Sequence, residues 1–316
     1  MCAAPLSSDA LRAAIRLPEG ATLMSRGPST GGEHTYCNLD AETFQVRGPT
    51  YLTDGRKVAA GPSAFELMEV ELFVCEDKIG NVAARRDSWL RAARAAGDTR
   101  YYLVVSYVTP ASPFVHVIFY YAVNQAQLDA KPHLQSLWTR FTAHGEEGDA
   151  FRNDRWKVIP RIAEGSWIVS SAVGTKPALL AQKLTHTWIL CDDIIDPTPP
   201  VATVPAVEAG CGPSGRARGS SFITHTGPGP YLEADCDVAS SSIAHMLVSL
   251  LQQYAKYIVI DLGFAIEPRS NDECPEVVLG TVRLSRIDVT APRMVKVVPG
   301  DWVLGKVGVT HEAGDE

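Results

Sequence analysis

A long stretch without charged side chains constrains the fold more than any other feature of this sequence. No Asp, Glu, Lys or Arg lies between Arg100 and Asp129, and both halves of the stretch are rich in β-branched and aromatic residues. A membrane-spanning helix needs about 20 consecutive apolar residues, whereas Pro110 and Pro113 interrupt this stretch at its middle. Prolines are common in turns and rare inside strands. The stretch therefore predicts a β-hairpin that is buried on both faces, and a transmembrane helix is the weaker alternative.

Shorter periodic segments surround this hairpin. Apolar residues at helical spacing predict helices at 88–96, 134–141 and 243–254. Strand patterns are expected at 44–47, 65–74, 156–162, 167–173, 231–238, 257–266 and 277–289. Because the strands come in runs, the sequence predicts an α+β fold, and an α/β fold is the weaker alternative. We expect a single domain in which a curved, mostly antiparallel sheet packs on the long apolar helix 243–254.

Irregular segments are expected around and within this domain. Residues 1–41 are interpreted as a lead-in segment and 301–316 as a C-terminal tail, so the domain would span 42–300. Residues 197–230 hold seven of the 21 prolines of the chain, a composition that no regular element tolerates. We therefore predict a Pro/Gly-rich insertion at about 190–230.

Composition excludes some classes of function. The chain has 29 Lys and Arg against 36 Asp and Glu, a formal net charge of −7, whereas nucleic-acid binding depends on dense positive charge. Seven cysteines without a C-x-x-C pair disfavour a zinc site or a disulfide framework. The N-terminus lacks the charged start and apolar run of a secretory signal. We expect a cytoplasmic protein, with peripheral membrane association as an option, and we predict no metal and no cofactor.

One row of carboxylates is a candidate for metal-dependent chemistry. Glu233, Asp235 and Asp237 occupy every second position of a predicted strand, and oxygen ligands in such a row could bind a metal ion. One strand alone supplies too few ligands for a closed site. An exposed strand face is therefore the simpler interpretation, and a carboxylate-dependent enzyme is the least favoured function.

Five short motifs follow one another along the chain. They are Phe44-x-Val46-Arg47-Gly48, Phe151-Arg152-Asn153-x-Arg155-x-Lys157, Glu164-Gly165-x-Trp167-Ile168-Val169, Tyr231-Leu232-Glu233-x-Asp235 and Pro275-Glu276-x-x-Leu279-Gly280. In this order, over about residues 42–290, the chain resembles the plant enhanced disease resistance 2 C-terminal domain family. It departs from the family at the Pro/Gly-rich segment and at Cys274, where Leu is expected.

The resemblance implies membrane-lipid biology and no catalytic mechanism. Members of this family often carry the domain behind a pleckstrin-homology domain and a START lipid-binding domain, and this chain is similar to a stand-alone copy. The leading hypothesis is therefore a non-catalytic lipid- or hydrophobic-ligand-binding module of a membrane-associated process.

The sheet and the helix 243–254 would then enclose an apolar cavity. Its candidate lining residues are Val104, Tyr107, Phe119, Tyr121, Trp167, Met246 and Leu250. Plain core packing is the alternative for each of them, because interiors are filled by the same residue types.

A basic group within one stretch of this acidic chain is the candidate contact for an anionic lipid head group. Its members are Arg152, Arg155, Lys157, Arg161 and Lys176. Ion pairs with the chain's own carboxylates are the alternative. A second hypothesis is a scaffolding subunit that docks to a larger assembly, with the loop 197–230 becoming ordered on a protein partner.

Overall fold

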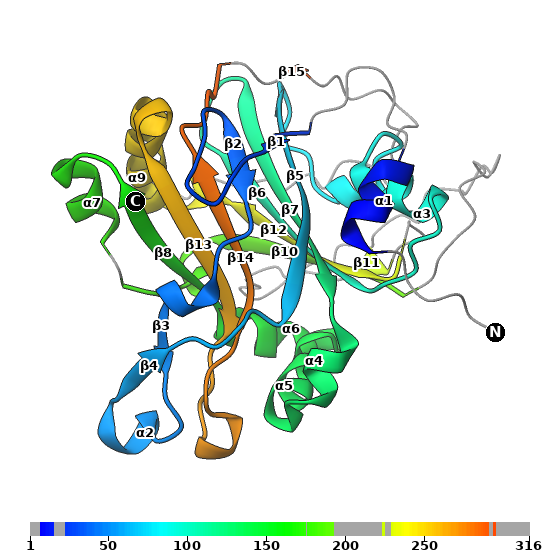
Figure 1. Ribbon diagram of the computed structural model, residues 1–316, viewed down its shortest axis with the longest axis vertical. Coiled ribbons are helices and arrows are strands. Elements are labelled where there is room, and N and C mark those ends of the chain that lie inside the picture. Colours follow the sequence, from blue (N-terminus) through cyan, green and yellow to red (C-terminus); the bar gives the residue numbers. More distant parts are fainter. Residues whose placement is uncertain are drawn as a thin grey trace, which may run out of the picture.

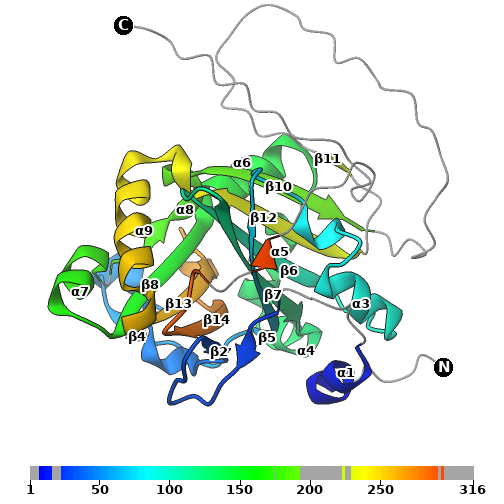
Figure 2. The same ribbon diagram turned by 90° about the horizontal axis from the view of Figure 1, so that it is seen from above.

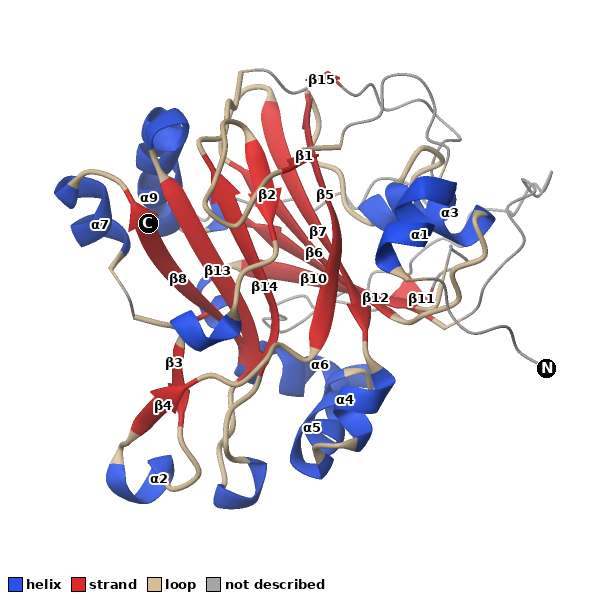
Figure 3. Ribbon diagram, in the orientation of Figure 1, coloured by secondary structure: helices blue, strands red, loops and turns tan. Residues whose placement is uncertain are grey.

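The structure is a computed structural model that describes residues 7–15, 23–174, 176–192, 223–224, 229–290 and 293–294. In these ranges, helices and mostly antiparallel strands form an α+β fold with two larger sheets (Figures 1 and 3). The predicted fold class is confirmed. The predicted insertion lies almost entirely outside the described residues, and the predicted tail lies wholly outside them.

The larger sheet is built around the predicted hairpin. In spatial order its strands are β11 (Ile223–Thr224), β10 (Thr185–Cys191), β12 (Tyr231–Asp237), β6 (Tyr102–Thr109), β7 (Phe114–Val123), β5 (Phe65–Cys75) and β15 (Arg293–Met294). The hairpin strands β6 and β7 pair antiparallel, with Val105 opposite Phe119. Alternate side chains of the hairpin enter two different apolar cores, one on each face of the sheet, which explains why its sequence is apolar at consecutive positions.

One face of this sheet packs against the helices α1 (Ser8–Ala14) and α3 (Trp89–Ala95) (Figure 1). Trp89 of α3 lies on Tyr102 and Tyr120 of the hairpin, with ring centroids 5.7 and 5.2 Å apart. The opposite face of the sheet contributes to a second core.

The second core lies between this sheet and a second sheet. The sequence predicted one curved sheet, but its strands form two separate sheets. In spatial order the second sheet contains β1 (Ser25–Arg26), β2 (Thr35–Cys37), β14 (Val278–Ser285), β13 (Val259–Ile266), β8 (Trp156–Glu164) and β9 (Ala178–Leu179). A separate hairpin pairs β3 (Gln45–Arg47) with β4 (Lys57–Ala59). Apolar side chains of both larger sheets form one cluster between them, which we call the inter-sheet core.

Helices lie at both ends of the inter-sheet core. They are α4 (Gln125–Asp129), α5 (Pro132–Phe141), α6 (Gly145–Arg155), α7 (Trp167–Val173), α8 (Leu180–Lys183) and α9 (Ser242–Tyr254), with the short α2 (Tyr51–Asp54) beside the small hairpin. Figures 1 and 2 show α4 and α5 at one end of the molecule and α7 and α9 near the other.

Two expectations about these helices are wrong. Residues 167–173, expected as a strand, form α7, because the Ser166 hydroxyl accepts the N–H of Val169 as an N-cap and Gly174 ends the helix at a φ of 64°. The helix 243–254 forms as α9 with Ser241 as its N-cap. However, none of its residues is buried, so it does not cover a sheet in the expected way.

Candidate functional site

Four aromatic side chains meet between the two sheets, and three of them belong to the predicted ligand-binding set. Tyr107 extends from β6, and Phe119 and Tyr121 extend from β7. Phe264 faces them from β13, with its ring centroid 5.9 to 6.4 Å from the other three centroids. We call these four residues the inter-sheet aromatic cluster. Aromatic pairs at this spacing attract one another beyond the effect of burial alone.

The hydroxyl of Tyr121 distinguishes this cluster from an ordinary apolar core. The side chain is fully buried, and its hydroxyl has no hydrogen-bond partner among the described residues. Burial raises the pKa of Tyr121 well above its usual value, so the hydroxyl stays neutral and can donate. A buried polar group without a partner costs about 1–3 kcal/mol. An oxygen atom of a bound molecule, or of water, would be stabilised here.

A glycine on the second sheet makes room for the Tyr121 ring. A Cβ atom at Gly280 of β14 would lie 2.5 Å from two carbons of that ring, far inside normal van der Waals contact. Gly280 belongs to the last of the five sequence motifs. One motif residue therefore directly supports the aromatic cluster.

Helix α9 packs on the inter-sheet core near the C-terminal end of β6. Ala244 and Val248 pack against the core from α9. Gln252 of the same helix donates a hydrogen bond of 2.9 Å to the hydroxyl of Thr109, at the end of the strand that carries Tyr107. Because no residue of α9 is buried, its displacement costs less free energy than that of a well-buried helix.

The other four residues of the predicted ligand-binding set do not join the cluster. Val104 lies in the core on the opposite face of the sheet, because it is an odd number of positions from Tyr107 on one strand. Trp167 and Met246 are exposed, by 77% and 69%, and Leu250 is half-buried on α9. Trp167 was expected on a strand, but residues 167–173 form the helix α7. Met246 and Leu250 were expected to be buried, but α9 has no buried residue.

Three of the five predicted head-group residues are bound by the chain itself. Arg152 is fully buried, donates to two backbone carbonyl oxygens at 2.7 and 2.8 Å, and pairs with Asp149. Lys157 is 3% exposed and pairs with Glu276. The guanidinium of Arg155 lies 2.7 Å from a carboxylate oxygen of Glu273. These three side chains are held by internal carboxylates, as the ion-pair alternative describes.

The remaining two basic residues reach the surface. Arg161 is 39% exposed and pairs with the buried Asp261 at 3.0 Å. Lys176 is exposed directly after α7. The five predicted residues therefore do not form one basic patch, and Arg161 and Lys176 are the two that a head group could contact.

The Lys157–Glu276 pair joins three of the sequence motifs. Glu276 also accepts a hydrogen bond of 3.0 Å from the backbone N–H of Arg47, and Arg47 pairs with Glu267 at 2.9 Å. The first, second and fifth motifs thus meet at one charged cluster that ties the small hairpin to the second sheet.

Two surface hollows are lined by other residues. One of about 190 Å³ opens beside Glu276 and is lined mainly by apolar atoms, with Lys131 and His133 at its wall. Another of about 490 Å³ is lined by Arg12, Arg26 and five further residues. None of the seven predicted ligand-binding residues lines either hollow.

The row of carboxylates on β12 binds backbone instead of facing solvent. Glu233 is fully buried and accepts hydrogen bonds of 2.6 and 3.0 Å from the first two N–H groups of the 3-10 helix Val82–Ala84. Asp235 accepts the N–H of Asn81 at 2.8 Å, whereas Asp237 is half-buried. Burial, followed by the charge of Asp235, raises the pKa of Glu233 well above its usual value. The expected exposed face is wrong because the loop before α3 covers it.

Within the described ranges, no group of three or more His, Cys, Asp or Glu side chains could hold a metal ion. A Cys–His pair does occur, which sequence spacing did not reveal. The Sγ of Cys236 lies 2.8 Å from Nε2 of His186, and Nδ1 of His186 lies 3.1 Å from the Leu184 carbonyl oxygen. Burial raises the pKa of the Cys236 thiol well above its usual value and lowers that of His186 to about 4. Reactive cysteines are partly exposed with a lowered pKa, so this pair lacks the environment of a nucleophile.

No described helix is both long enough and apolar enough to cross a membrane. The predicted partner-binding loop, 197–230, lies almost wholly outside the described residues, so partner binding through it stays a prediction.

Comparisons with known proteins identify relatives. The family model described as "Protein ENHANCED DISEASE RESISTANCE 2, C-terminal" matches residues 36–288. A protein from Arabidopsis thaliana, "Protein ENHANCED DISEASE RESISTANCE 2-like", is 27% identical over 252 residues, which cover 80% of this chain and 28% of that protein. This chain thus spans less than a third of the relative's length. No solved structure matches the chain significantly.

Proposed function

Since the chain belongs to the Enhanced Disease Resistance 2 C-terminal family, we propose that its domain binds a lipid or other apolar molecule between the two sheets without catalysing a reaction. The observation that carries this proposal is the buried Tyr121 hydroxyl, which has no partner among the described residues in a surrounding of aromatic rings. Binding sites for small molecules combine mostly apolar walls with a few polar groups that fix orientation. The aromatic cluster has this composition.

The chemistry of the cluster defines the kind of ligand. The rings of Tyr107, Phe119 and Phe264 would pack against a hydrocarbon chain. The Tyr121 hydroxyl, kept neutral by burial, would donate to a carbonyl, carboxyl or hydroxyl oxygen of the ligand. A molecule with one polar group that accepts a hydrogen bond, at the end of an apolar body, satisfies both requirements, and a long-chain fatty acid is an example.

Helix α9 supplies the route of entry in this proposal. It covers one end of the inter-sheet core through Ala244 and Val248 and buries none of its own residues. In this proposal the site is closed in the empty protein and opens when the covering helix moves. Ligand binding then stabilises the open conformation.

Oleic acid binding by the full chain tests the proposal. Native mass spectrometry of the protein after incubation with oleic acid should show a one-to-one complex, and calorimetry should give its affinity. Tyr121→Phe removes the donor and keeps the ring, so the affinity should fall about five- to tenfold, the value of one hydrogen bond.

Tyr101→Phe is the matched control. The Tyr101 hydroxyl is also buried without a partner among the described residues, but its ring packs on Trp138 of α5, with centroids 6.0 Å apart. This variant should bind oleic acid like the wild type. Absence of a complex with the wild type, or equal affinities for wild type and Tyr121→Phe, would overturn the proposal.

A further inference from the structure

Exposed large apolar side chains are concentrated on one surface of the molecule. Six such side chains are exposed in the described part of the chain, and Leu52 is the one that lies elsewhere. The other five, Trp167, Ile168, Ile243, Met246 and Tyr257, belong to α7, to α9 and to the 3-10 turn Ala255–Tyr257 that follows α9. We call these five residues the α7–α9 surface. Trp167, Ile243 and Tyr257 are the most exposed, at 77%, 74% and 74%.

The two helices of this surface are neighbours. They contact one another, and Figures 1 and 2 show them side by side at the edge of the second sheet, away from α1 and α3. Single exposed apolar residues are ordinary on soluble proteins, but a grouped set marks a contact surface.

The same two helices carry no formal charge. Neither 166–174 nor 239–255 contains an Asp, Glu, Lys or Arg residue. A helix exposed to water normally carries charged side chains on its outer face, yet α9 has 13 residues, none buried and none charged. Its exposed polar side chains are Ser242, His245 and Gln253.

The charges around this surface favour an anionic partner. Lys176 is exposed directly after α7, and Lys256, which is 50% exposed, follows α9. The acidic neighbours Glu164 and Asp288 are paired with Arg286 at one side and with Lys256 at the other. The rim is therefore not negative, although the whole chain has a net charge of −7.

We infer that the α7–α9 surface docks on a lipid bilayer that contains anionic lipid. Exposed Trp and Tyr side chains favour the interface between lipid head groups and acyl chains, and apolar side chains on an uncharged helix face insert just below it. Lys176 would contact the negative head groups at the rim. A protein partner, including a second copy of the chain, is the alternative that the experiment below distinguishes.

This inference rests on the proposed lipid binding and gives it a direction. Helix α9 belongs both to the docking surface and to the cover of the inter-sheet core. Docking would therefore bring the movable end of that core to the bilayer from which an apolar ligand comes.

Vesicle flotation tests the inference. The probes are vesicles of phosphatidylcholine alone and vesicles with about 30% phosphatidylserine. The wild type should float with the mixed vesicles and more weakly with phosphatidylcholine alone. Trp167→Ser combined with Met246→Ser should weaken binding to the mixed vesicles more than tenfold. Lys176→Glu should reduce binding to the mixed vesicles and leave the weak binding to phosphatidylcholine unchanged.

Leu52→Ser is the matched control, because Leu52 is 44% exposed on α2, away from this surface. It should float like the wild type. No flotation of the wild type, or an equal loss with Leu52→Ser, would overturn the inference. So would a wild-type dimer in sedimentation that the double substitution converts to a monomer, because the surface would then bind a second copy.

The two proposals can fail separately. All substituted side chains here are exposed, so the variants should fold and should still bind oleic acid from detergent. Loss of flotation with oleic acid binding retained supports the docking surface. Flotation by a protein that binds no oleic acid would overturn the ligand site between the sheets and leave the docking surface standing.

Discussion

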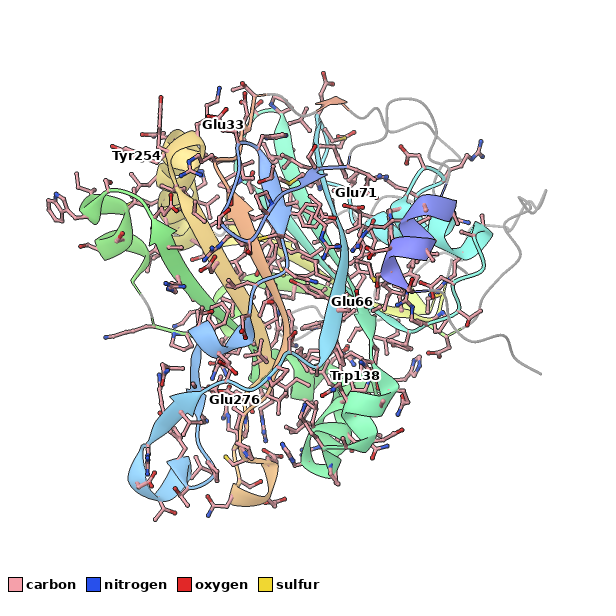
Figure 4. The ribbon with its side chains drawn as sticks, viewed as in Figure 1. Glu33, Glu66, Glu71, Trp138, Tyr254 and Glu276 are labelled. Carbon is pink, nitrogen blue, oxygen red and sulfur yellow. The ribbon has the colours of Figure 1, made fainter. Side chains whose placement is uncertain are left out.

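Helices α5 and α9 lie at different ends of the same core, and they have opposite relations to it (Figure 4, where Trp138 marks α5 and Tyr254 marks α9). Both have an apolar stripe in their sequences. Helix α5 buries Leu134, Leu137, Trp138 and Phe141, whereas α9 buries none of its 13 residues.

The polar faces of the two helices explain what this difference means. Helix α5 presents Arg140 to solvent, where it pairs with Glu273 at 2.9 Å, so its two faces are suited to core and water. Helix α9 has no charged residue on any face. An apolar stripe therefore indicates that a helix needs an apolar partner, but that partner is the protein's own sheet for α5 and, in our proposal, a bilayer for α9.

Truncating one apolar side chain on each helix should give the largest difference between α5 and α9. Phe141 is fully buried and contacts Trp138, Trp156 and Trp188, so Phe141→Ala should lower the free energy of unfolding by about 3–5 kcal/mol. Met246→Ala on α9 should change it by less than about 0.5 kcal/mol. Urea titrations followed by tryptophan fluorescence measure both values. A comparable loss from Met246→Ala would show that α9 is part of the folded core.

The dependence of stability on pH distinguishes a buried histidine from an exposed one. Burial lowers the pKa of His186 to about 4, so the folded protein keeps it neutral while the unfolded chain takes up a proton below about pH 6.5. Its contribution to stability is complete above pH 6.5 and is lost as the pH falls to 4, up to about 3 kcal/mol. His186→Gln should remove this contribution from the slope measured in unfolding experiments between pH 7 and 4, whereas the buried His116, whose pKa burial also lowers to about 4, keeps its own contribution.

His245 provides the control for that measurement, because it is exposed on α9. His245→Gln makes the same substitution at a surface position and controls for the general effect of replacing an imidazole by an amide. An equal change of slope in both variants would contradict the assignment of the effect to the buried imidazole.

The sequence was sufficient to predict the central hairpin, the α+β class and the positions of most of the longer strands. The uncharged stretch between Arg100 and Asp129 required burial on both faces, and Pro110 and Pro113 required a turn between two strands. Residue propensities alone gave a wrong prediction where capping residues favoured a different element. The β-branched residues of 167–173 indicated a strand, but capping by Ser166 and the stop at Gly174 made a helix.

The candidate site was only partly predictable, because it depends on pairing between distant segments. Tyr107, Phe119 and Tyr121 could be grouped from alternation along the hairpin, but Phe264 and Gly280 come from a second sheet whose existence no local pattern reveals. The burial of Arg152 and Lys157 likewise depends on carboxylates and carbonyl groups supplied by other segments. A charge pattern alone does not separate an internal ion pair from a surface patch.

The N-cap residues of α3 and α9 should give the smallest differences in stability. Ser88 caps α3, which is buried in the other core, and its hydroxyl accepts the N–H of Arg91 at 3.2 Å. The same hydroxyl donates a hydrogen bond of 2.7 Å to the Ala83 carbonyl oxygen, so Ser88→Ala should lower the global free energy of unfolding by about 1–3 kcal/mol. Ser241 caps α9 through the N–H of Ala244 at 3.4 Å.

For Ser241→Ala we expect a different result, because α9 has no buried residue whose loss would unfold the rest. Its own amide protons should exchange about fivefold faster with solvent, which corresponds to about 1 kcal/mol of lost cap. The global free energy of unfolding should change by a few tenths of a kcal/mol at most. If instead the Ser241 variant lost as much global stability as the Ser88 variant, α9 would unfold together with the core, and it could not open or dock independently of it.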